Sequence, residues 1–506
     1  MGNQVSRSGG TTGKKTFSPS EAQNNAQEKS HGQSNKKAMS RTASGADIEH
    51  STHTQFLPLD NLAKILVGLA QKEESVNGVT SSVFERYLFP RYSEFAERLF
   101  AYLHTSSKAT TTHLGLAAFK QQAERFLGIM KDRTILENYI KMYSRSSSSS
   151  ECCEVTPDSL RALLMTSYRL AMENYSGGSQ TCLHIHRTID AVLISCFHGK
   201  DSLSVSYVAN WLSQHCPRIV QGLHRYVVHV LTTAYRNGET LLSQERSQLR
   251  LEPGTPVLEK TTFEGLKPLL PVSHAWLLST ILPISYTQAE DPPSEASGGA
   301  SHALIAKMVG NACPSHWTLL YNSGQHGNGA NRFLHHVLGY RGPTLLFIRG
   351  VSLDEADDCP TYCVCSAVEW RESHLYWGDE DSIVIELLPT YRVVEKGPKL
   401  LYLNTGIRGY PQGIRAGSDP RNPCVNIDQS FGSVKLAGVP YRIASLEVWG
   451  CGDRKSRERQ LEIKKWQVKE AERQRVVKLS TTDWLDHPDR YLLELAGRPS
   501  YNNAGS

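Results

Sequence analysis

Cysteine and histidine supply the most reactive side chains in this sequence, and they gather in two places. In the first, Cys182, His184 and His186 alternate, with Cys196 and His198 a short distance on. On a strand this alternation would put three metal ligands on one face, whereas a helix would scatter them, and no C-x-x-C pair closes a tetrahedral site. Because Cys is commonly a small core residue, we expect a buried helix here and no metal site.

The second group is the pair Cys363 and Cys365, which would share one face of a strand. A reactive thiol must be exposed and have a lowered pKa. The acidic residues of the segment 354–358 would instead raise the pKa of a thiol nearby. Buried, inert thiols are therefore the favoured interpretation, and thiol-based protection against oxidative stress remains an alternative.

Two glycine-rich runs have some features of phosphate-binding loops. In Gly324–Arg332 an arginine stands where a dinucleotide loop has its third glycine, and Gly10–Thr16 lacks the spacing of a Walker A loop. No G-x-S-x-G nucleophile elbow occurs. The sequence therefore predicts no catalytic residue and no cofactor.

The amino terminus carries a lipidation signal. Met1–Ser6 fits the pattern M-G-x-x-x-[ST], in which Gly2 is myristoylated after Met1 is removed. A single acyl chain binds membranes only marginally, so a second attachment is needed. Basic side chains next to an anionic leaflet can supply it, and the candidates here are Arg7, Lys14, Lys15, Lys36, Lys37 and Arg41. We expect a cytoplasmic protein attached peripherally to an anionic membrane surface.

The distribution of charge supports contacts at the two ends of the chain. The net charge is +5 over 506 residues. Residues 1–46 hold seven Lys or Arg against two acidic residues, and residues 453–478 hold ten against five, so the remainder sums to −5. Nucleic-acid binding is not predicted, because it requires a basic folded surface. The 11 irregularly spaced cysteines indicate a reducing compartment.

The regions of the chain that must position these candidate residues differ in their sequence patterns. Residues 1–54 have almost nothing to bury and are expected to form a disordered tail. Residues 55–250 repeat apolar side chains at helical spacing and predict a helical domain, with Thr156 as a cap before Pro157. Paired helices of this kind suggest EF-hands, but no stretch has the ligands of a calcium loop, so we predict no calcium site.

The second half of the chain has strand-like runs separated by glycine-rich turns, over residues 263–452, with a flexible loop at 287–302. The expected strands are Trp317–Tyr321, Thr344–Arg349, Tyr362–Val368, Ile383–Leu388, Lys399–Leu403 and Ile443–Trp449. Asp453–Thr482 lacks Gly and Pro and predicts one long charged helix, which begins a helical extension over residues 453–506. The predicted fold class is α+β.

Residues 263–452 resemble the TLDc domain of the oxidation-resistance protein family. The matching stretches are Trp276-Leu277-Leu278, Leu319–Ser323 before His326-Gly327, Gly342–Leu346, Tyr376–Asp379, Tyr402–Asn404 and Leu446–Gly450. The order of regions, from Met1-Gly2 to a final Tyr491–Gly497, resembles the subgroup of the restriction-of-telomere-capping protein five and the EAK-seven-type mTOR-associated proteins.

This resemblance implies a two-layer β-sandwich with flanking helices and no established catalytic site. It also implies association with the vacuolar proton-pumping ATPase and a link to lysosomal nutrient signalling. We therefore expect a non-enzymatic regulatory binding protein on the cytosolic face of endolysosomal or vacuolar membranes. A membrane-tethered scaffold for an mTOR-type kinase complex is the alternative.

The long charged helix supplies candidate contacts for such a partner. Leu461, Trp466 and Val468 are its apolar anchors, and the surrounding Lys and Arg would meet an acidic surface. With so few apolar residues, this helix is not expected to be held against its own domain by hydrophobic burial. The competing interpretation is a solvated helix that only links the domain to the terminal segment.

Overall fold

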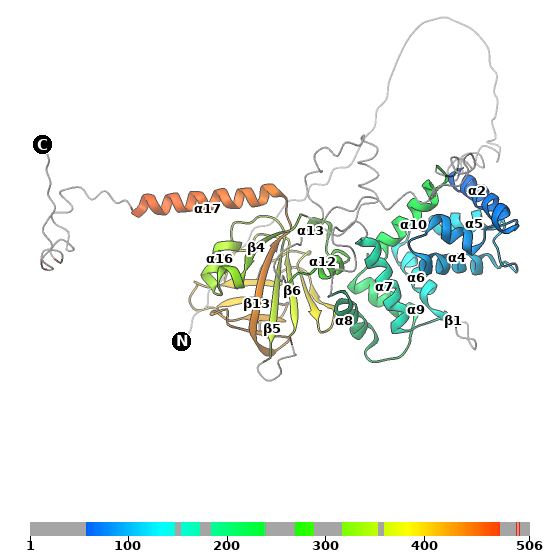
Figure 1. Ribbon diagram of the computed structural model, residues 1–506. Helices are drawn as coiled ribbons and strands as arrows, with labels where there is room; N and C mark the ends of the chain where they lie inside the picture. Colours follow the sequence, from blue (N-terminus) through cyan, green and yellow to red (C-terminus); the bar gives the residue numbers. More distant parts are fainter. Residues whose placement is uncertain are drawn as a thin grey trace, which may run out of the picture. The chain divides into compact units, whose positions relative to one another are not determined.

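The computed structural model describes residues 57–146, 153–172, 184–236, 238, 269–287, 316–352, 359–475, 492 and 495. The chain divides into two units, residues 1–54 and 55–506. The predicted tail is the first unit and lies outside the described residues. The second unit contains the helices and the antiparallel sheet shown in Figure 1, and it confirms the α+β class.

The first half of the second unit is helical, as the apolar periodicity predicts. Its helices are α2 (Leu57–Glu74), α3 (Ser81–Leu88), α4 (Ser93–Ser107), α5 (Leu116–Leu127), α6 (Asp132–Tyr143), α7 (Pro157–Ala171), α8 (Ile185–Phe197), α9 (Val205–His215) and α10 (Gln221–Thr233). The predicted cap is confirmed, since the Thr156 side chain accepts a hydrogen bond from the Ser159 amide and Pro157 opens α7.

Short antiparallel bridges join the turns between these helices. Val79 and Leu114 exchange two backbone hydrogen bonds of 2.7 and 2.9 Å, which connect the α2–α3 turn to the α4–α5 turn. A three-stranded sheet of β1 (Arg145–Ser146), β2 (Cys153–Val155) and β3 (Leu203–Ser204) connects the α6–α7 and α8–α9 turns. Strands of two or three residues are too short to show a period in the sequence.

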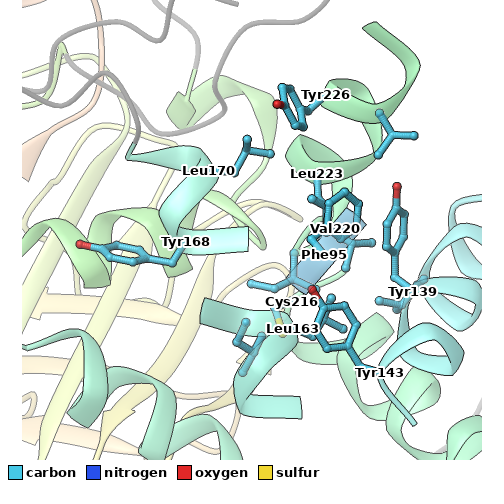
Figure 2. Close-up of a cluster of buried hydrophobic side chains, with 14 of the residues drawn as sticks. Phe95, Tyr139, Tyr143, Leu163, Tyr168, Leu170, Cys216, Val220, Leu223 and Tyr226 are labelled. Atoms are coloured by element: carbon cyan, nitrogen blue, oxygen red, sulfur yellow. The ribbon is translucent and has the colours of Figure 1, made fainter. Parts of the chain in front are cut away.

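Aromatic side chains fill the core of the helical half (Figure 2). Tyr139 packs edge-on against Phe126, with ring centroids 5.9 Å apart, and lies nearly parallel to Phe95. The Tyr143 hydroxyl, on the same helix, donates to Thr166 on α7. Large aromatic side chains bury the most apolar surface per residue, which lets a few helices form a stable core.

The second half is one antiparallel sheet with the strand order β8-β7-β6-β5-β13-β12-β11-β10-β9, and β4 also pairs with β13. The bounds are β4 (Thr318–Asn322), β5 (Thr344–Val351), β6 (Thr361–Ser366), β7 (Ile383–Leu388), β8 (Arg392–Lys396), β9 (Leu401–Asn404), β10 (Gly413–Ala416), β11 (Val425–Ile427), β12 (Ser433–Leu436) and β13 (Val439–Gly450). Strands from both ends of this order share one core, which includes Val384 and Leu403. The two layers expected of the sandwich are therefore halves of a single sheet.

Strands β5, β6 and β7 are buried on both faces. Leu346 and Val364 face the core inside the sheet, whereas Phe347 and Cys363 join the core of the helical half. The helix α12 (Val272–Ser279), which is buried throughout, belongs to the same core as Phe347 and Cys363. Burial on both faces explains why these strands are nearly continuous apolar runs in the sequence.

Hydrogen bonds fasten the helical half to the edge strand β8. The Tyr391 hydroxyl donates to the His215 carbonyl oxygen at 2.8 Å, and the Val393 amide donates to His215 Nδ1 at 3.0 Å. Partial burial, followed by the charge of Arg392, lowers the pKa of His215 and favours the neutral ring that can accept this bond.

Candidate functional site

At the end of β13 the backbone passes so close to Tyr340 and Gly342 that there is no space for a side chain at Gly450. We call this place, formed by Tyr340, Gly342, Gly450 and Gly452, the glycine slot. The Gly452 amide donates to the Tyr340 hydroxyl at 2.8 Å. A Cβ added to Gly450 would lie 2.6 Å from Tyr340 Cζ, and one added to Gly342 would lie 2.8 Å from the Gly452 Cα. The glycines at this junction therefore let the chain leave the sheet directly beside Tyr340.

The long helix α17 (Arg454–Arg475) begins shortly after the end of β13 (Figure 1). Asp453 caps it, because its carboxylate accepts hydrogen bonds from the Ser456 amide at 2.8 Å and the Ser456 hydroxyl at 2.6 Å. These bonds hold the pKa of Asp453 below its usual value. The predicted continuation of the helix to Thr482, and most of the helical extension predicted to residue 506, lie beyond the continuously described residues.

Gln460 fastens the base of α17 to the sheet domain. Its side chain is fully buried, and its Nε2 donates to the carbonyl oxygens of His336 at 3.0 Å, Leu338 at 3.1 Å and Val337 at 3.4 Å. These carbonyls lie at the end of the helix α16 (Ala330–Val337), where backbone acceptors lack partners within the helix. The Val337 oxygen also accepts a hydrogen bond from the Tyr340 amide at 3.4 Å. The expectation that hydrophobic burial would not hold α17 is therefore compatible with a firm attachment, which hydrogen bonds provide.

The three predicted contact residues lie on α17 and are exposed. The exposed fractions are 42% for Leu461, 65% for Trp466 and 54% for Val468. Leu461 and Val468 are seven positions apart and share one face, but Trp466 lies on another side of the helix. The structure thus exposes all three residues without gathering them into one stripe. Exposed apolar side chains that do not form a patch are common on protein surfaces, so their exposure leaves them available to a partner without marking an interface.

The cysteines considered for redox chemistry are buried. Cys363 and Cys365 are fully inaccessible to solvent, and their Sγ atoms are 3.8 Å apart. Burial raises the pKa of Cys363 well above its ordinary value, and the neighbouring thiols of Cys365 and Cys451 add to this effect. The thiols are buried, as predicted. Burial is the largest cause of the raised pKa of Cys363, and the acidic segment 354–358 lies outside the described residues.

The described cysteine and histidine side chains near α8 are not brought together into one site. Cys196 is buried and its pKa is raised by burial to about 12, whereas His184, His186 and His198 are exposed. Cys182 lies outside the described residues. Within the described part of the chain, no three His, Cys, Asp or Glu side chains are placed to hold a metal ion.

The glycine-rich run Gly324–Arg332 forms the short helix α15 (Ser323–His326) and the start of α16. The strand before it, β4, is antiparallel to β13, so the run does not belong to the parallel βαβ unit of a dinucleotide loop. Residues 328–332, with Thr405 and Gln429, line an open pocket of about 470 Å³.

The membrane-binding candidates lie outside the described residues. These are Gly2 and the basic residues Arg7, Lys14, Lys15, Lys36, Lys37 and Arg41. None of the described helices combines the length and the apolar character that crossing a bilayer requires.

Comparison with known proteins identifies the sheet domain. The TLDc domain family matches residues 303–452. Three fungal proteins named restriction of telomere capping protein 5 are similar to this chain. The protein of Pyricularia oryzae is 25% identical over 261 residues, covering 37% of this chain and 41% of the relative. That of Lachancea thermotolerans is 30% identical over 155 residues, covering 26% and 27%. That of Kluyveromyces lactis is 26% identical over 265 residues, covering 38% and 46%.

The match spans between about a quarter and a half of the length of these relatives. The strands of the sheet, from β4 at Thr318 to the end of β13 at Gly450, all lie within the residues that the family matches. This chain therefore carries a TLDc domain and is similar to the restriction of telomere capping 5 proteins.

Proposed function

We propose that this chain is a non-enzymatic regulatory binding protein of endolysosomal or vacuolar membranes. In this proposal, its TLDc domain and α17 bind the cytosolic sector of the vacuolar proton-pumping ATPase. A myristoylated Gly2 and the basic tail hold the chain at the cytosolic face of the membrane.

The attachment of α17 is the observation that carries this proposal. The base of the helix is fixed to the TLDc domain through Gln460, whereas Leu461, Trp466 and Val468 expose large apolar side chains. A helix that is fixed at one end and exposed along the rest can bind a partner with little loss of conformational freedom. Its apolar side chains would enter a groove, and its lysines and arginines would face acidic residues.

The thiol alternative has less support. A thiol that consumes peroxide must meet it as a thiolate. Cys363 is inaccessible and its pKa is raised, which opposes both requirements. The scaffold alternative uses the same membrane attachment with a different partner, and the binding experiment below separates the two.

The binding test uses the purified cytosolic sector of the ATPase and the full chain. The variant Leu461→Ser/Val468→Ser removes the shared apolar face of α17. The matched control Gln467→Ser/Glu472→Ser introduces the same number of serines at exposed positions of that helix. We expect the first variant to bind at least about tenfold more weakly, because buried apolar anchors dominate such interfaces. The control should bind within about twofold of the wild type on the same affinity scale.

Equal affinity of both variants would show that the binding surface lies on the sheet and not on α17. Truncation after Asp453 then tests whether the TLDc domain binds without the helix. Failure of the wild-type chain to bind the sector, together with recovery of a kinase complex in affinity purification, would favour the scaffold alternative.

Membrane attachment is tested by Gly2→Ala. The acyl chain requires an N-terminal glycine, and the basic tail alone binds weakly, so this variant should leave the membrane fraction of cells. Gly10→Ala makes the same substitution outside the lipidation pattern and should remain bound. Unchanged membrane content of Gly2→Ala would contradict the anchor.

A further inference from the structure

Histidines and cations from three helices meet where α17 crosses the end of α16. The rings of His326 and His336 stack with centroids 3.9 Å apart, and the His335 ring meets His336 edge-on at 5.1 Å. Arg457, Gln460 and Lys464 follow one another at helical spacing on the side of α17 that carries the Gln460 contact. We call His326, His335, His336, Arg457 and Lys464 the cationic cluster.

No acidic side chain forms an ion pair with this cluster in the described part of the chain, although Asp453, the cap of α17, lies one helical turn before Arg457. None of its five members has a carboxylate oxygen within 4 Å there. The helical neighbours of Lys464 three and four positions away are Gln460, Leu461, Gln467 and Val468, none of which is acidic. Lys464 is also half-buried, and a partly buried cation without a counter-ion is costly.

The dipole of α16 compensates only part of this charge. A helix C-terminus carries about half a negative charge, and three of the carbonyls that produce it already accept hydrogen bonds from Gln460. Arg457 and Lys464 bring two positive charges before any histidine takes up a proton. The junction therefore keeps an excess of positive charge.

We propose that the cationic cluster is a binding site for a phosphate group, free or carried by a lipid. A tetrahedral dianion offers more acceptor oxygens than a carboxylate, and a guanidinium, an ammonium and imidazole N–H groups can all donate to it. The site includes His326 from the glycine-rich run, which the proposed function does not use. The proposal does not depend on ATPase binding.

The titration of the cluster gives the site a predictable pH dependence. Partial burial, together with His326, Lys464, His335 and Arg457, lowers the pKa of His336 to about 4. Burial and Arg457 lower the pKa of Lys464 to about 8. Tyr321 on β4 is the other ring against the stack, and Arg332 adds charge beside His335. A bound anion favours protonated histidine, so binding should strengthen as pH falls from 7.5 towards 5.5.

Calorimetric titration of the full chain with inorganic phosphate tests the site, with ionic strength held constant by chloride. Lys464→Met keeps the length of the side chain and removes its charge, and it should weaken binding about tenfold or more. Lys469→Met is the matched control, because Lys469 is exposed on the same helix outside the cluster. Lys464→Arg should restore binding, and a thermal melt of each variant verifies folding.

The pH profile is measured with inorganic sulfate, because its charge is constant over this range. Wild-type affinity should rise towards low pH, and His336→Gln should flatten the profile. Equal phosphate affinity of Lys464→Met and Lys469→Met would overturn the proposal. A wild-type chain that binds neither anion would do the same.

Vesicles distinguish the two sources of phosphate. Unacylated chain is sedimented with phosphatidylcholine vesicles, with or without a phosphatidylinositol phosphate. The basic tail is identical in all variants, so a loss of sedimentation confined to Lys464→Met identifies a lipid headgroup. Equal sedimentation, combined with weakened binding of inorganic phosphate, identifies a soluble phosphate ligand.

Discussion

The base of α17 and its distal part have similar charged compositions but different surroundings. In the base, Arg454–Lys464, Gln460 is fully buried and Lys464 is half-buried. In the distal part, Lys465–Arg475, the exposed side chains include Trp466 and Val468. One amide with three carbonyl acceptors therefore decides where this helix is held. Hydropathy indicates that this helix is polar, but it does not show where the helix is attached. That depends on the position of the α16 carbonyl oxygens that Gln460 contacts.

The largest effect should come from Trp449, in the strand that leads to the base. Trp449 is 8% exposed, and its Nε1 donates to the buried Glu447 carboxylate at 3.0 Å. Trp449→Ala should destabilise the TLDc domain by about 3–5 kcal/mol, because it leaves a cavity and removes a donor from that carboxylate. Urea unfolding measures the loss. An unchanged transition combined with lost partner binding would make Trp449 a contact residue instead.

An intermediate effect is expected at Gln460, where the two parts of α17 can be compared directly. Gln460→Leu has a similar volume but removes the side-chain donor that three carbonyls share, at a cost of about 1–3 kcal/mol. Gln467→Leu, the same change at an exposed position of the distal part, should alter stability by about 0.5 kcal/mol or less. Faster hydrogen exchange of the α17 amides in Gln460→Leu alone would show that the base has come loose. Equal exchange in the two variants would contradict the attachment.

The smallest effect on stability is expected at Trp466. Its side chain is 65% exposed, so Trp466→Ala should shift the free energy of unfolding by about 0.5 kcal/mol or less. The contrast with Trp449→Ala is then between a tryptophan that holds the fold and one that is available to a partner. A large loss of stability in Trp466→Ala would show that the distal part packs on the chain after all.

Much of the fold follows from local patterns in the sequence. The cap at Thr156 and the strand Ile383–Leu388 occur as predicted, because one depends on neighbouring residues and the other on a continuous apolar run. Within the predicted helical domain, the helices α3 and α4 are separated around Pro90, which cannot continue a helix. The sequence does not predict the strands β8, β10 and β12, because each has four or five residues and lies among turns.

The site was less predictable than the fold. The exposure of Leu461, Trp466 and Val468 follows from their scarcity on a charged helix. The role of Gln460 does not, because its three acceptors lie more than 120 residues earlier in the chain. The cationic cluster has the same origin, since only the tertiary structure brings α17, with Lys464, beside the helix that carries His336. Tyr340 and its glycine slot likewise combine residues that are far apart in sequence.

The double burial of β5–β7 gives the molecule an internal reporter of its own opening. Cys363, Cys365 and Cys451 lie in the apolar layer that the sheet shares with the helical half, and all three are inaccessible to solvent. A thiol reagent reaches them only in those moments when the layer separates, so their rate of alkylation counts separations rather than chemical reactivity. The alkylation rate of these three native cysteines therefore measures how often the buried interface opens, without an added label.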